Sequence, residues 1–330
     1  MTQLQAGLKA ELQAAWLLRE KLGVFSSSDA IRVFHGPGEG SGALLGIAIE
    51  RFGEHYWITE WEKCPKLEIV ADFLRSHGAR SAVRLFRPPK GVPANPDVLF
   101  GEPPQGRFSI RESGAIYRVQ FLGTKHPGLF LDHAPLREWL LAGGARGLSV
   151  LNSFAYTGSL SVAAGLGGAS RVTTLGLSKP AIEWARENWQ SNGLPAGRGE
   201  FIFGDYFEWM QRLEKKKRLF DCVIVDPPSF SRGKKGSFST SKDLEKLHEL
   251  AFGILSPGGL LVTSINSAGV TRKKYFYDVH SAARSRSRKI EIIHEIELPA
   301  TFPIRPGAES GPGSGPEADR YLKGWILRSV

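Results

Sequence analysis

The sequence predicts an α/β protein: a seven-stranded, mainly parallel sheet with an antiparallel last strand, preceded by a smaller α+β domain. Three observations support this prediction. From about residue 135, short apolar runs alternate with helical patterns, which is typical of a parallel sheet covered by helices. Residues 1–120 instead hold several β-type runs close together. The length of 330 residues suits two domains of ordinary size, 1–120 and 121–330.

Residues 1–120 are expected to form a small α+β domain. Leu4, Leu8 and Leu12 lie four apart and indicate an amphipathic helix that ends near Gly23. Prolines crowd positions 88–104 and indicate a connecting arm. The other expected elements are strands at 31–34, 44–51, 55–61 and 82–86, a helix at 66–75, and a hairpin at 107–111 and 116–121.

The alternating part of the chain fills residues 121–330. Two late strands, at 289–297 and 321–328, have no helical pattern between them and predict an antiparallel hairpin at one edge. The stretch 306–319 between these strands is rich in Gly, Pro and Ser, which indicates a mobile loop. The remaining strands are expected at 149–154, 171–175, 200–203, 221–225 and 259–265, with helices from 158 and at 179–192, 206–215, 243–255 and 273–285.

The composition narrows the class of protein. The net charge of +10 favours an acidic partner such as nucleic acid, although a basic enzyme of small metabolites also fits. The two cysteines, Cys64 and Cys222, lie far apart and argue against a disulfide framework or a zinc site. No apolar run approaches the ~20 residues that span a bilayer, and charged residues between positions 9 and 21 interrupt any signal-peptide pattern. We therefore expect a cytoplasmic protein without a bound metal.

Four of the predicted strand ends carry unusual residues. They are Asn152–Gly158 (NSFAYTG), Gly204-Asp205, Asp226–Phe230 (DPPSF) and Asn266-Ser267. In an open α/β sheet, ligands bind outside the carboxyl ends of the strands. These four segments are therefore expected to share one crevice.

With these motifs the chain resembles the S-adenosylmethionine-dependent methyltransferases of the Rossmann-like class. More narrowly, it is similar to the bacterial 23S rRNA large-subunit methyltransferase family whose members make 5-methylcytosine. The matching stretches are Lys125–Asp132 (KHPGLFLD), Val150–Gly158 (VLNSFAYTG), Asp226–Arg232 (DPPSFSR) with Lys234 and Lys235, and Tyr321–Gly324 (YLKG). The resemblance implies S-adenosylmethionine as cofactor and RNA as substrate. The N-terminal PUA RNA-binding domain usual in that family is not apparent.

The resemblance also implies which residues hold the cofactor. The loop after the first strand would approach the methionine part, and Gly158 would permit close backbone contact. Asp205 would accept a hydrogen bond from the adenine amino group, and the alternative interpretation is a cap of the following helix. The full predicted cofactor set is Phe130, Asp132, His133, Asn152, Ser153, Phe154, Ala155, Tyr156, Gly158, Ser178, Asp205, Tyr206 and Asp226.

The most specific candidate for a catalytic motif is Asp226-Pro227-Pro228 with Phe230. In methyltransferases that act on amines of bases, such a motif accepts the N–H bonds of the target and orients its lone pair toward the methyl group. Phe230 would stack on the base, and Asn266 would contact it. A rigid Pro-Pro turn after a buried strand is the alternative interpretation. The predicted catalytic residues are Asp226, Pro227, Phe230 and Asn266.

Two departures from the family pattern change the expected chemistry. Methylation at C5 of cytosine needs a cysteine thiolate, but the corresponding positions hold Asn266 and Ser229, and Cys222 is expected in the core. A base nitrogen is therefore the expected target. Gly176 stands where an acidic residue would bond the ribose, and Ser178 could supply only one hydrogen bond, which predicts weak or rearranged cofactor binding.

Short basic runs indicate how RNA would be held. The runs Arg232–Lys235 and Arg272–Lys274 follow motifs of the crevice and are expected to contact phosphates, through Arg232, Lys234, Lys235, Arg272, Lys273 and Lys274. The run Lys215–Arg218 is interpreted as the solvated end of a helix. Two alternatives remain open at this point, an RNA-binding pseudo-enzyme without turnover and a methyltransferase of small molecules. The strands of residues 1–120 could pair, bind RNA or form an interface between copies of the chain.

Overall fold

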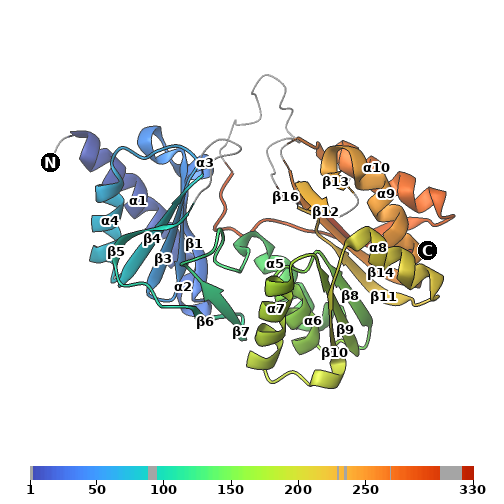
Figure 1. The fold of residues 1–330 in the computed structure, drawn as a ribbon. Coiled ribbons are helices and arrows are strands. Elements are labelled where there is room, and N and C mark those ends of the chain that lie inside the picture. Colours follow the sequence, from blue (N-terminus) through green and yellow to red (C-terminus); the bar gives the residue numbers. More distant parts are fainter. Residues whose placement is uncertain (1–2, 88–94, 229, 234–235, 268, 305–321) are drawn as a thin grey trace. The chain divides into compact units, whose positions relative to one another are not determined.

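The computed structural model describes residues 3–87, 95–228, 230–233, 236–267, 269–304 and 322–330. The chain forms two compact units (Figure 1). The first is Met1–Asp132 with Pro299–Pro306, and the second is His133–Leu298 with Gly307–Val330. The sequence-based boundary at residue 120 thus falls inside the first unit.

A five-stranded sheet in the order β1-β2-β3-β4-β5 forms the centre of the first unit. Only β3 and β4 run parallel, and helix α4 connects them. Helices α1 and α4 pack against one face of this sheet (Figure 1), where their leucines and Trp16 meet Tyr56 and Ile58 of β3. The bounds are α1 Gln3–Lys21, α2 Val24–Ser27, β1 Ala30–His35, α3 Gly36–Glu39, β2 Ile47–Phe52, β3 His55–Glu60, α4 Leu67–Ser76, β4 Ser81–Phe86 and β5 Asp97–Gly101.

The expectation of a connecting arm over residues 88–104 is wrong for its middle part, which forms strand β5. Asp97–Gly101 pairs antiparallel with β4 at the edge of the sheet. The strand was missed because it is short, largely exposed and flanked by prolines, which normally indicate irregular chain. Residues 88–94 of the expected arm lie outside the described residues.

The other face of the first sheet carries the predicted hairpin, β6 (Arg107–Glu112) and β7 (Ala115–Gln120). Phe121, directly after β7, lies within 6 Å of the ring centroids of Phe52, Trp57 and Phe108. Aromatic pairs at such distances add stability beyond the apolar area that they bury. The hairpin is therefore part of the core of the first unit.

The segment Pro299–Pro306 belongs to the first unit, and the buried Arg19 contacts it. Arg19 is fully buried and pairs with both carboxylate oxygens of Glu39 at 2.5 and 2.7 Å. The same guanidinium donates a hydrogen bond to the carbonyl oxygen of Thr301 at 2.7 Å. Arg32 lies over the ring of Phe302 at 4.1 Å. A buried charge is costly unless it is paired, so these contacts fix residues 301–302 to helix α1 and strand β1.

The second unit contains the predicted α/β sheet, with seven strands in the order β10-β9-β8-β11-β14-β16-β15. The first five strands in this order are mutually parallel. The strand bounds are β8 Ser149–Ser153, β9 Arg171–Gly176, β10 Gly199–Phe203, β11 Phe220–Val225, β14 Leu255–Asn266, β15 Ile290–Glu295 and β16 Leu322–Ser329.

The last strand confirms the predicted antiparallel direction. β16 runs antiparallel to both of its neighbours, β14 and β15. It thereby separates β15 from β14 and leaves β15 at the edge of the sheet. The stretch 306–319, expected as a loop between these strands, lies outside the described residues.

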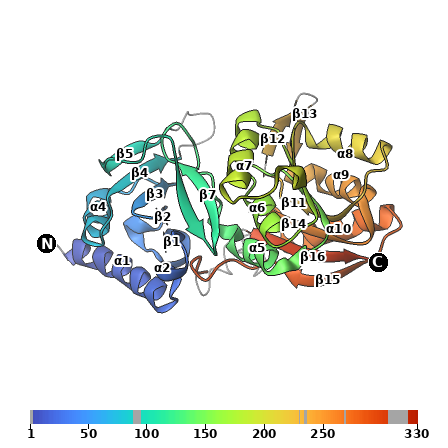
Figure 2. The same cartoon turned by 90° about the horizontal axis from the view of Figure 1, so that it is seen from below.

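Helices cover both faces of this sheet, as Figures 1 and 2 agree, with α5–α7 on one face and α8–α10 on the other. Val223 and Val225 of β11 pack against α8–α10. Cys222, the residue before Val223, points to the other side of the sheet and is fully buried, as predicted. A short hairpin, β12 (Phe230–Gly233) and β13 (Gly236–Ser239), follows β11. The helix bounds are α5 Ala134–Trp139, α6 Ser159–Leu166, α7 Lys179–Ser191, α8 Tyr206–Lys215, α9 Thr240–Gly253 and α10 Arg272–Ser285.

Candidate active site

The predicted site residues of the second unit gather at one edge of its sheet. Because β8, β9, β10, β11 and β14 are parallel, their carboxyl ends share that edge. Asp226 directly follows β11, Asn266 ends β14, and Gly158 lies between β8 and α6. Ligands of open α/β sheets bind outside such an edge, so the geometry defines a candidate site there.

Asp226 is fixed by two side chains from distant parts of the chain. Ser264 of β14 donates its hydroxyl hydrogen to Asp226 Oδ1 at 2.7 Å. His133 Nε2 lies 3.2 Å from Ser264 Oγ and 3.4 Å from the same Asp226 oxygen. The Asp226 side chain keeps 27% of its surface exposed, whereas that of His133 keeps 7%. The carboxylate is therefore held on one oxygen and still accessible from outside.

Ser264 is a site residue to which the sequence analysis gave no role. Its relative exposure is 1%. From the sequence, the role of contacting the base was predicted for Asn266, two positions further along at the end of β14. The available signal was the pair of hydroxyl residues Thr263 and Ser264 after the apolar run Leu260–Val262, since a buried hydroxyl needs a hydrogen-bond partner.

The loop after β8 holds an unusual backbone. Phe154 and Tyr156 have φ values of 58° and 49°, in the left-handed region that non-glycine residues rarely adopt. Gly158 has φ 75°, and a Cβ there would lie 2.7 Å from Cβ of Ala185. Strained backbone of this kind persists where packing fixes it and is concentrated at ligand sites. The close approach of Gly158 to α7 explains why a glycine stands at this position.

Two predicted cofactor residues of this loop use their side chains inside the sheet. Asn152 donates from Nδ2 to Ser161 Oγ at 2.9 Å, and Ser153 donates to the carbonyl oxygen of Ile224 at 2.7 Å. Both are buried, with relative exposures of 1% and 0%. These side chains position the strand end, so any contact with a ligand would come from the backbone that follows them.

Asp205 and Ser178 both cap helices. Asp205 Oδ1 accepts a hydrogen bond from the backbone N–H of Glu208 at 3.2 Å, and Ser178 Oγ accepts one from Ala181 at 3.4 Å. Tyr206 stacks on Phe154 with ring centroids 4.6 Å apart and donates its hydroxyl hydrogen to the carbonyl of Leu247. A cap occupies one oxygen of a carboxylate, so Asp205 keeps its second oxygen as a possible acceptor for a ligand.

Two apolar side chains lie exposed beside these caps. Leu177 follows β9 and is 43% exposed, and Phe203 ends β10 and is 54% exposed. Apolar surface next to a free carboxylate oxygen suits an adenine, which is flat, apolar on its faces and polar at its edge. The residues present therefore fit an adenosyl group, although Gly176, also at this edge, offers no carboxylate to a ribose.

Three predicted residues lie around the boundary between the units. Phe130 and Asp132 belong to the first unit, and His133 begins the second. Phe130 is 43% exposed and stacks on His126 at 4.0 Å. His133 lies beside Asp226, as described above.

Several residues of the basic runs form ion pairs within the protein. Arg272 pairs with Glu295 through both of its terminal nitrogens, and Lys274 pairs with Asp278 at 2.7 Å. Lys273 is exposed. Arg232 lies on β12, and Lys234 and Lys235 lie outside the described residues.

Arg218 of the third basic run has a structural role. It pairs with Glu200 of β10, and this hydrogen bond is the main cause that lowers the pKa of the Glu200 carboxyl. This ion pair connects the segment after helix α8 to β10 at the edge of the sheet.

Over the described residues, no group of three or more His, Cys, Asp or Glu side chains is arranged to hold a metal ion. Across the same part of the chain, no helix is both long and apolar enough to cross a membrane.

The fold and this site define a Rossmann-like methyltransferase. A profile of the family described as S-adenosylmethionine-dependent methyltransferase matches residues 76–311. The chain belongs to this family, and its cofactor is S-adenosylmethionine.

Individual relatives agree with this assignment. The chain is 31% identical to ribosomal RNA large subunit methyltransferase I of Photobacterium profundum over 239 residues, 72% of this chain and 58% of that protein. It is 28% identical to the protein of the same name from Erwinia tasmaniensis over 328 residues, 97% of this chain and 79% of that one. The crystal structure of SMU.776 complexed with SAH superposes with a TM-score of 0.88 at 27% identity, covering 98% and 81% of the two chains.

Proposed function

We propose that this methyltransferase modifies a base nitrogen of RNA, with ribosomal RNA as the substrate class. The proposal rests on one observation, namely that the Asp226 carboxylate is both held in place and accessible. One carboxylate oxygen is held by Ser264 and approached by His133, and the side chain stays 27% exposed. Such a group can accept hydrogen bonds from an incoming amine without moving, and preorganised acceptors of this kind are effective in catalysis.

The cofactor, when bound, supplies a methyl group on a positively charged sulfur that leaves as a neutral thioether. The backbone of residues 154–158 would hold its methionine part. Leu177, Phe203 and the free oxygen of Asp205 would hold the adenine. Ser178 and the backbone near Gly176 would contact the ribose without a carboxylate, which is why we expect a modest affinity.

The protein groups then act on the acceptor. Asp226 and the carbonyl of Pro227 would accept the N–H bonds of the target amine, which directs the nitrogen lone pair toward the methyl group. Phe230 on β12 would stack on the base, and the exposed Asn266 would contact its edge. The proton released from the methylated nitrogen has an acceptor in the Asp226 carboxylate.

The cysteines favour nitrogen over carbon as the target. Methylation of C5 of a pyrimidine needs a thiolate that attacks the ring. Cys222 is fully buried, and burial raises its pKa to about 12, so it stays a thiol at neutral pH. The strand end that would carry the family's cysteine holds Asn266.

RNA as the substrate is supported by charge and by the names of the relatives. The net charge of +10 favours a polyanion, and the exposed Lys273 adds a cation in the first turn of α10, the helix that follows β14. Arg232, Lys234, Lys235, Arg272 and Lys274 are the other proposed phosphate contacts. A ribosomal substrate would also place the protein in the cytoplasm.

Transfer of a labelled methyl group to ribosomal RNA, followed by digestion to nucleosides, tests the proposal. We expect an N-methylated nucleoside with the wild type. Asp226→Ala should lower kcat by about 100-fold while calorimetry still detects cofactor binding. Asp221→Asn is a matched control, because Asp221 lies at the opposite end of the same strand and bonds Ser149. A 5-methylcytosine product, or full activity in Asp226→Ala, would contradict the proposal.

A further inference from the structure

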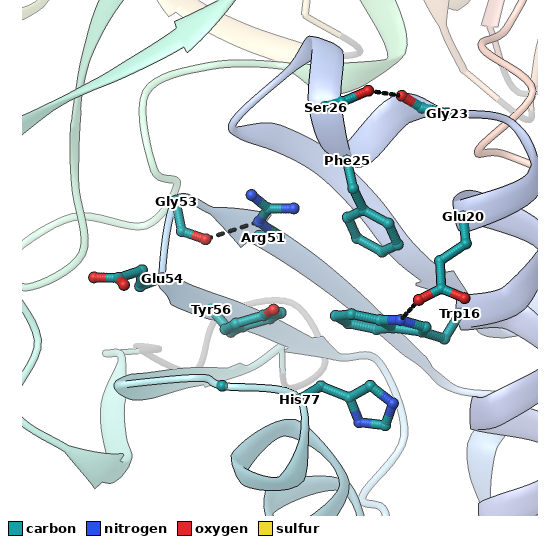
Figure 3. A pocket seen from close by; sticks show the side chains of 11 residues that line it. Trp16, Glu20, Gly23, Phe25, Ser26, Arg51, Gly53, Glu54, Tyr56 and His77 are labelled. Atoms are coloured by element: carbon teal, nitrogen blue, oxygen red, sulfur yellow. Dashed lines mark hydrogen bonds between the residues drawn. The ribbon is translucent and has the colours of Figure 1, made fainter.

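The first unit contains a pocket that the proposed chemistry does not use. Its volume is about 500 Å³, within the range of about 300–1,000 Å³ usual for small-molecule sites. It lies where the end of α1, helix α2, the β2–β3 turn and the end of α4 meet (Figure 3). The rim residues Glu20, Gly23, Ser26, Glu54 and Gly78 are exposed, so the pocket is accessible from outside.

Four of the residues that line it carry rings, the buried Trp16 and Tyr56 and the half-buried Phe25 and His77. Trp16 is packed between Phe25 and His77, with ring centroids at 4.5 and 4.3 Å. Tyr56 lies on the facing strand, and Figure 3 shows its ring beside Trp16 with Arg51 and His77 on opposite sides. Rings fixed in this way lose little entropy when a flat ligand packs against them, which favours a planar aromatic ligand.

Arg51 supplies the positive charge of the pocket, whose rim also carries the carboxylates of Glu20 and Glu54. It is the direct partner of Tyr56 across the β2–β3 pair, so both side chains project from the same face of the sheet. Its Nε donates to the carbonyl of Gly53 at 2.8 Å, and its guanidinium lies 5.2 Å from the ring centroid of Phe25. This anchoring through Nε leaves the two terminal nitrogens as donors, which is the arrangement that binds phosphate oxygens in a fork.

The remaining polar atoms suit the edge of a nucleobase. Glu20 Oε1 accepts a hydrogen bond from Trp16 Nε1 at 2.8 Å, which holds the carboxylate at the rim with its second oxygen available as an acceptor. His77 Nδ1 donates to the carbonyl of Phe73 at 2.8 Å, so Nε2 is an acceptor in the neutral ring. Burial raises the pKa of Tyr56 to about 12, so its hydroxyl remains a donor at neutral pH.

The same contacts argue against two other ligand classes. An organic cation would prefer the face of an aromatic ring, but Arg51 already lies over Phe25 and would repel it. A polyanion without aromatic parts would meet Glu20, and it would leave the apolar surface of Trp16 and Phe25 unused. A nucleotide combines a flat base, a polar base edge and one phosphate. The rings of the pocket match the base, the polar atoms at its rim match the base edge, and Arg51 matches the phosphate.

We propose that this pocket binds an unstacked nucleotide of the RNA substrate, with its base against Phe25, Trp16 and Tyr56 and its phosphate on Arg51. The proposal rests on RNA being the substrate. It adds a second RNA contact in the first unit, separate from the residues that act on the target base. Proteins read single-stranded RNA through unstacked bases held in this way on aromatic and arginine side chains.

Binding of fluorescently labelled single-stranded ribosomal RNA to the full chain tests the pocket, together with methyl transfer to the same RNA. Phe25→Leu keeps the apolar packing and removes the ring, and Arg51→Gln removes the charge. Each should weaken RNA affinity by about 5- to 50-fold and raise KM for RNA, with cofactor affinity unchanged. Arg75→Gln is the matched control, because Arg75 also lies over a phenylalanine ring, Phe100 at 4.4 Å, but outside the pocket.

Photocrosslinking of RNA that contains 4-thiouridine supplies an independent readout. We expect crosslinked peptides that contain Phe25 or Tyr56, and their loss in Arg51→Gln. If both pocket variants bind and methylate RNA as Arg75→Gln does, and no crosslink falls in the pocket, the pocket assignment is wrong while RNA methylation stands. If the wild type neither binds nor methylates RNA, the proposed function fails as well. Melting temperatures equal to that of the control exclude a folding defect as the cause.

Discussion

Ser264 of β14 donates a hydrogen bond at 2.7 Å to Oδ1 of Asp226, the residue that follows the neighbouring strand β11. A second Ser–Asp hydrogen bond joins the same part of the sheet at the opposite ends of these strands. Asp221, near the start of β11, has a lowered pKa mainly because the backbone N–H and the hydroxyl of Ser149 donate to its carboxylate, and Ser256, near the start of β14, adds a smaller hydrogen-bond contribution. One pair lies at the carboxyl ends of the strands and the other at the amino ends. The two pairs therefore allow the orientation of the proposed catalytic group, Asp226, to be tested separately from stabilisation of the sheet.

We expect Ser264→Ala to lower kcat for methyl transfer by about tenfold, equivalent to about 1.4 kcal/mol, because Asp226 loses its orienting donor. Ser256→Ala should leave kcat unchanged and lower only the free energy of unfolding. Steady-state kinetics with labelled cofactor and urea unfolding measure both quantities. Equal effects of the two substitutions on kcat would show that Ser264 has no positioning role.

Gly176 offers a direct test of the ribose contact. A Cβ at this position would lie 3.1 Å from Cδ1 of Ile182, the flexible tip of a side chain, so a carboxylate can be accommodated after a small shift. Gly176→Asp should strengthen cofactor binding by about tenfold, since each hydrogen bond with a charged partner contributes about 1.5–3 kcal/mol before the packing cost. Calorimetry measures the affinity, with Gly176→Ala as the control for the added Cβ alone. Tight binding by the wild type, with no gain in Gly176→Asp, would refute this expectation.

Cys222 should be dispensable for methyl transfer. It is fully buried, and its pKa is raised to about 12 by burial. Cys222→Ala should keep the wild-type kcat and destabilise the fold by about 1 kcal/mol. RNA that contains 5-fluorocytosine should form no covalent adduct with either protein in denaturing gels. An adduct that disappears in Cys222→Ala would restore the covalent mechanism.

Acid should destabilise the second unit through His248. Burial lowers the pKa of this histidine from 6.5 to about 4, and its Nδ1 donates to the carbonyl of Leu244 while Nε2 accepts from Thr263. Between these two pH values the unfolded chain binds a proton that the folded chain does not. The free energy of unfolding should therefore fall by up to about 1.4 kcal/mol per pH unit in that window, and this contribution should be constant above about pH 7.

His248→Gln preserves an acceptor for Thr263 and removes the titration. Urea unfolding at several pH values should show a shallower loss of stability on acidification in this variant than in the wild type. His280→Gln on the exposed surface of α10 is the control. Identical slopes in all three proteins would mean that His248 does not carry the effect.

The sequence predicted the sheet of the second unit well, because strand and helix periodicities are local properties. Helix α8 has the predicted bounds Tyr206–Lys215, and Cys222 lies in the core as expected. Strand β5 shows the limit of this reasoning. Prolines surround Asp97–Gly101, and only the pairing with β4 makes the segment a strand.

The residues around Asp226 show the same limit at the site. The motif Asp226-Pro227-Pro228 is visible in the sequence because an acidic residue ends an apolar strand. His133 and Ser264 are 131 positions apart, so no local pattern connects them. Arg272 is similar: the sequence shows a basic run, whereas its pairing with Glu295 depends on how α10 lies beside β15.

The sequence by itself determined the α/β class, the strand ends that carry polar residues and the positions of the two cysteines, Cys64 and Cys222. These are properties of residue type and spacing along the chain. Only the tertiary structure decided that β16 lies between β14 and β15, that Ser264 and His133 hold Asp226, and that Trp16, Phe25, Tyr56 and Arg51 form one pocket. The physical reason is that these contacts join residues far apart in the chain, and their geometry exists only once the packed elements have brought them together.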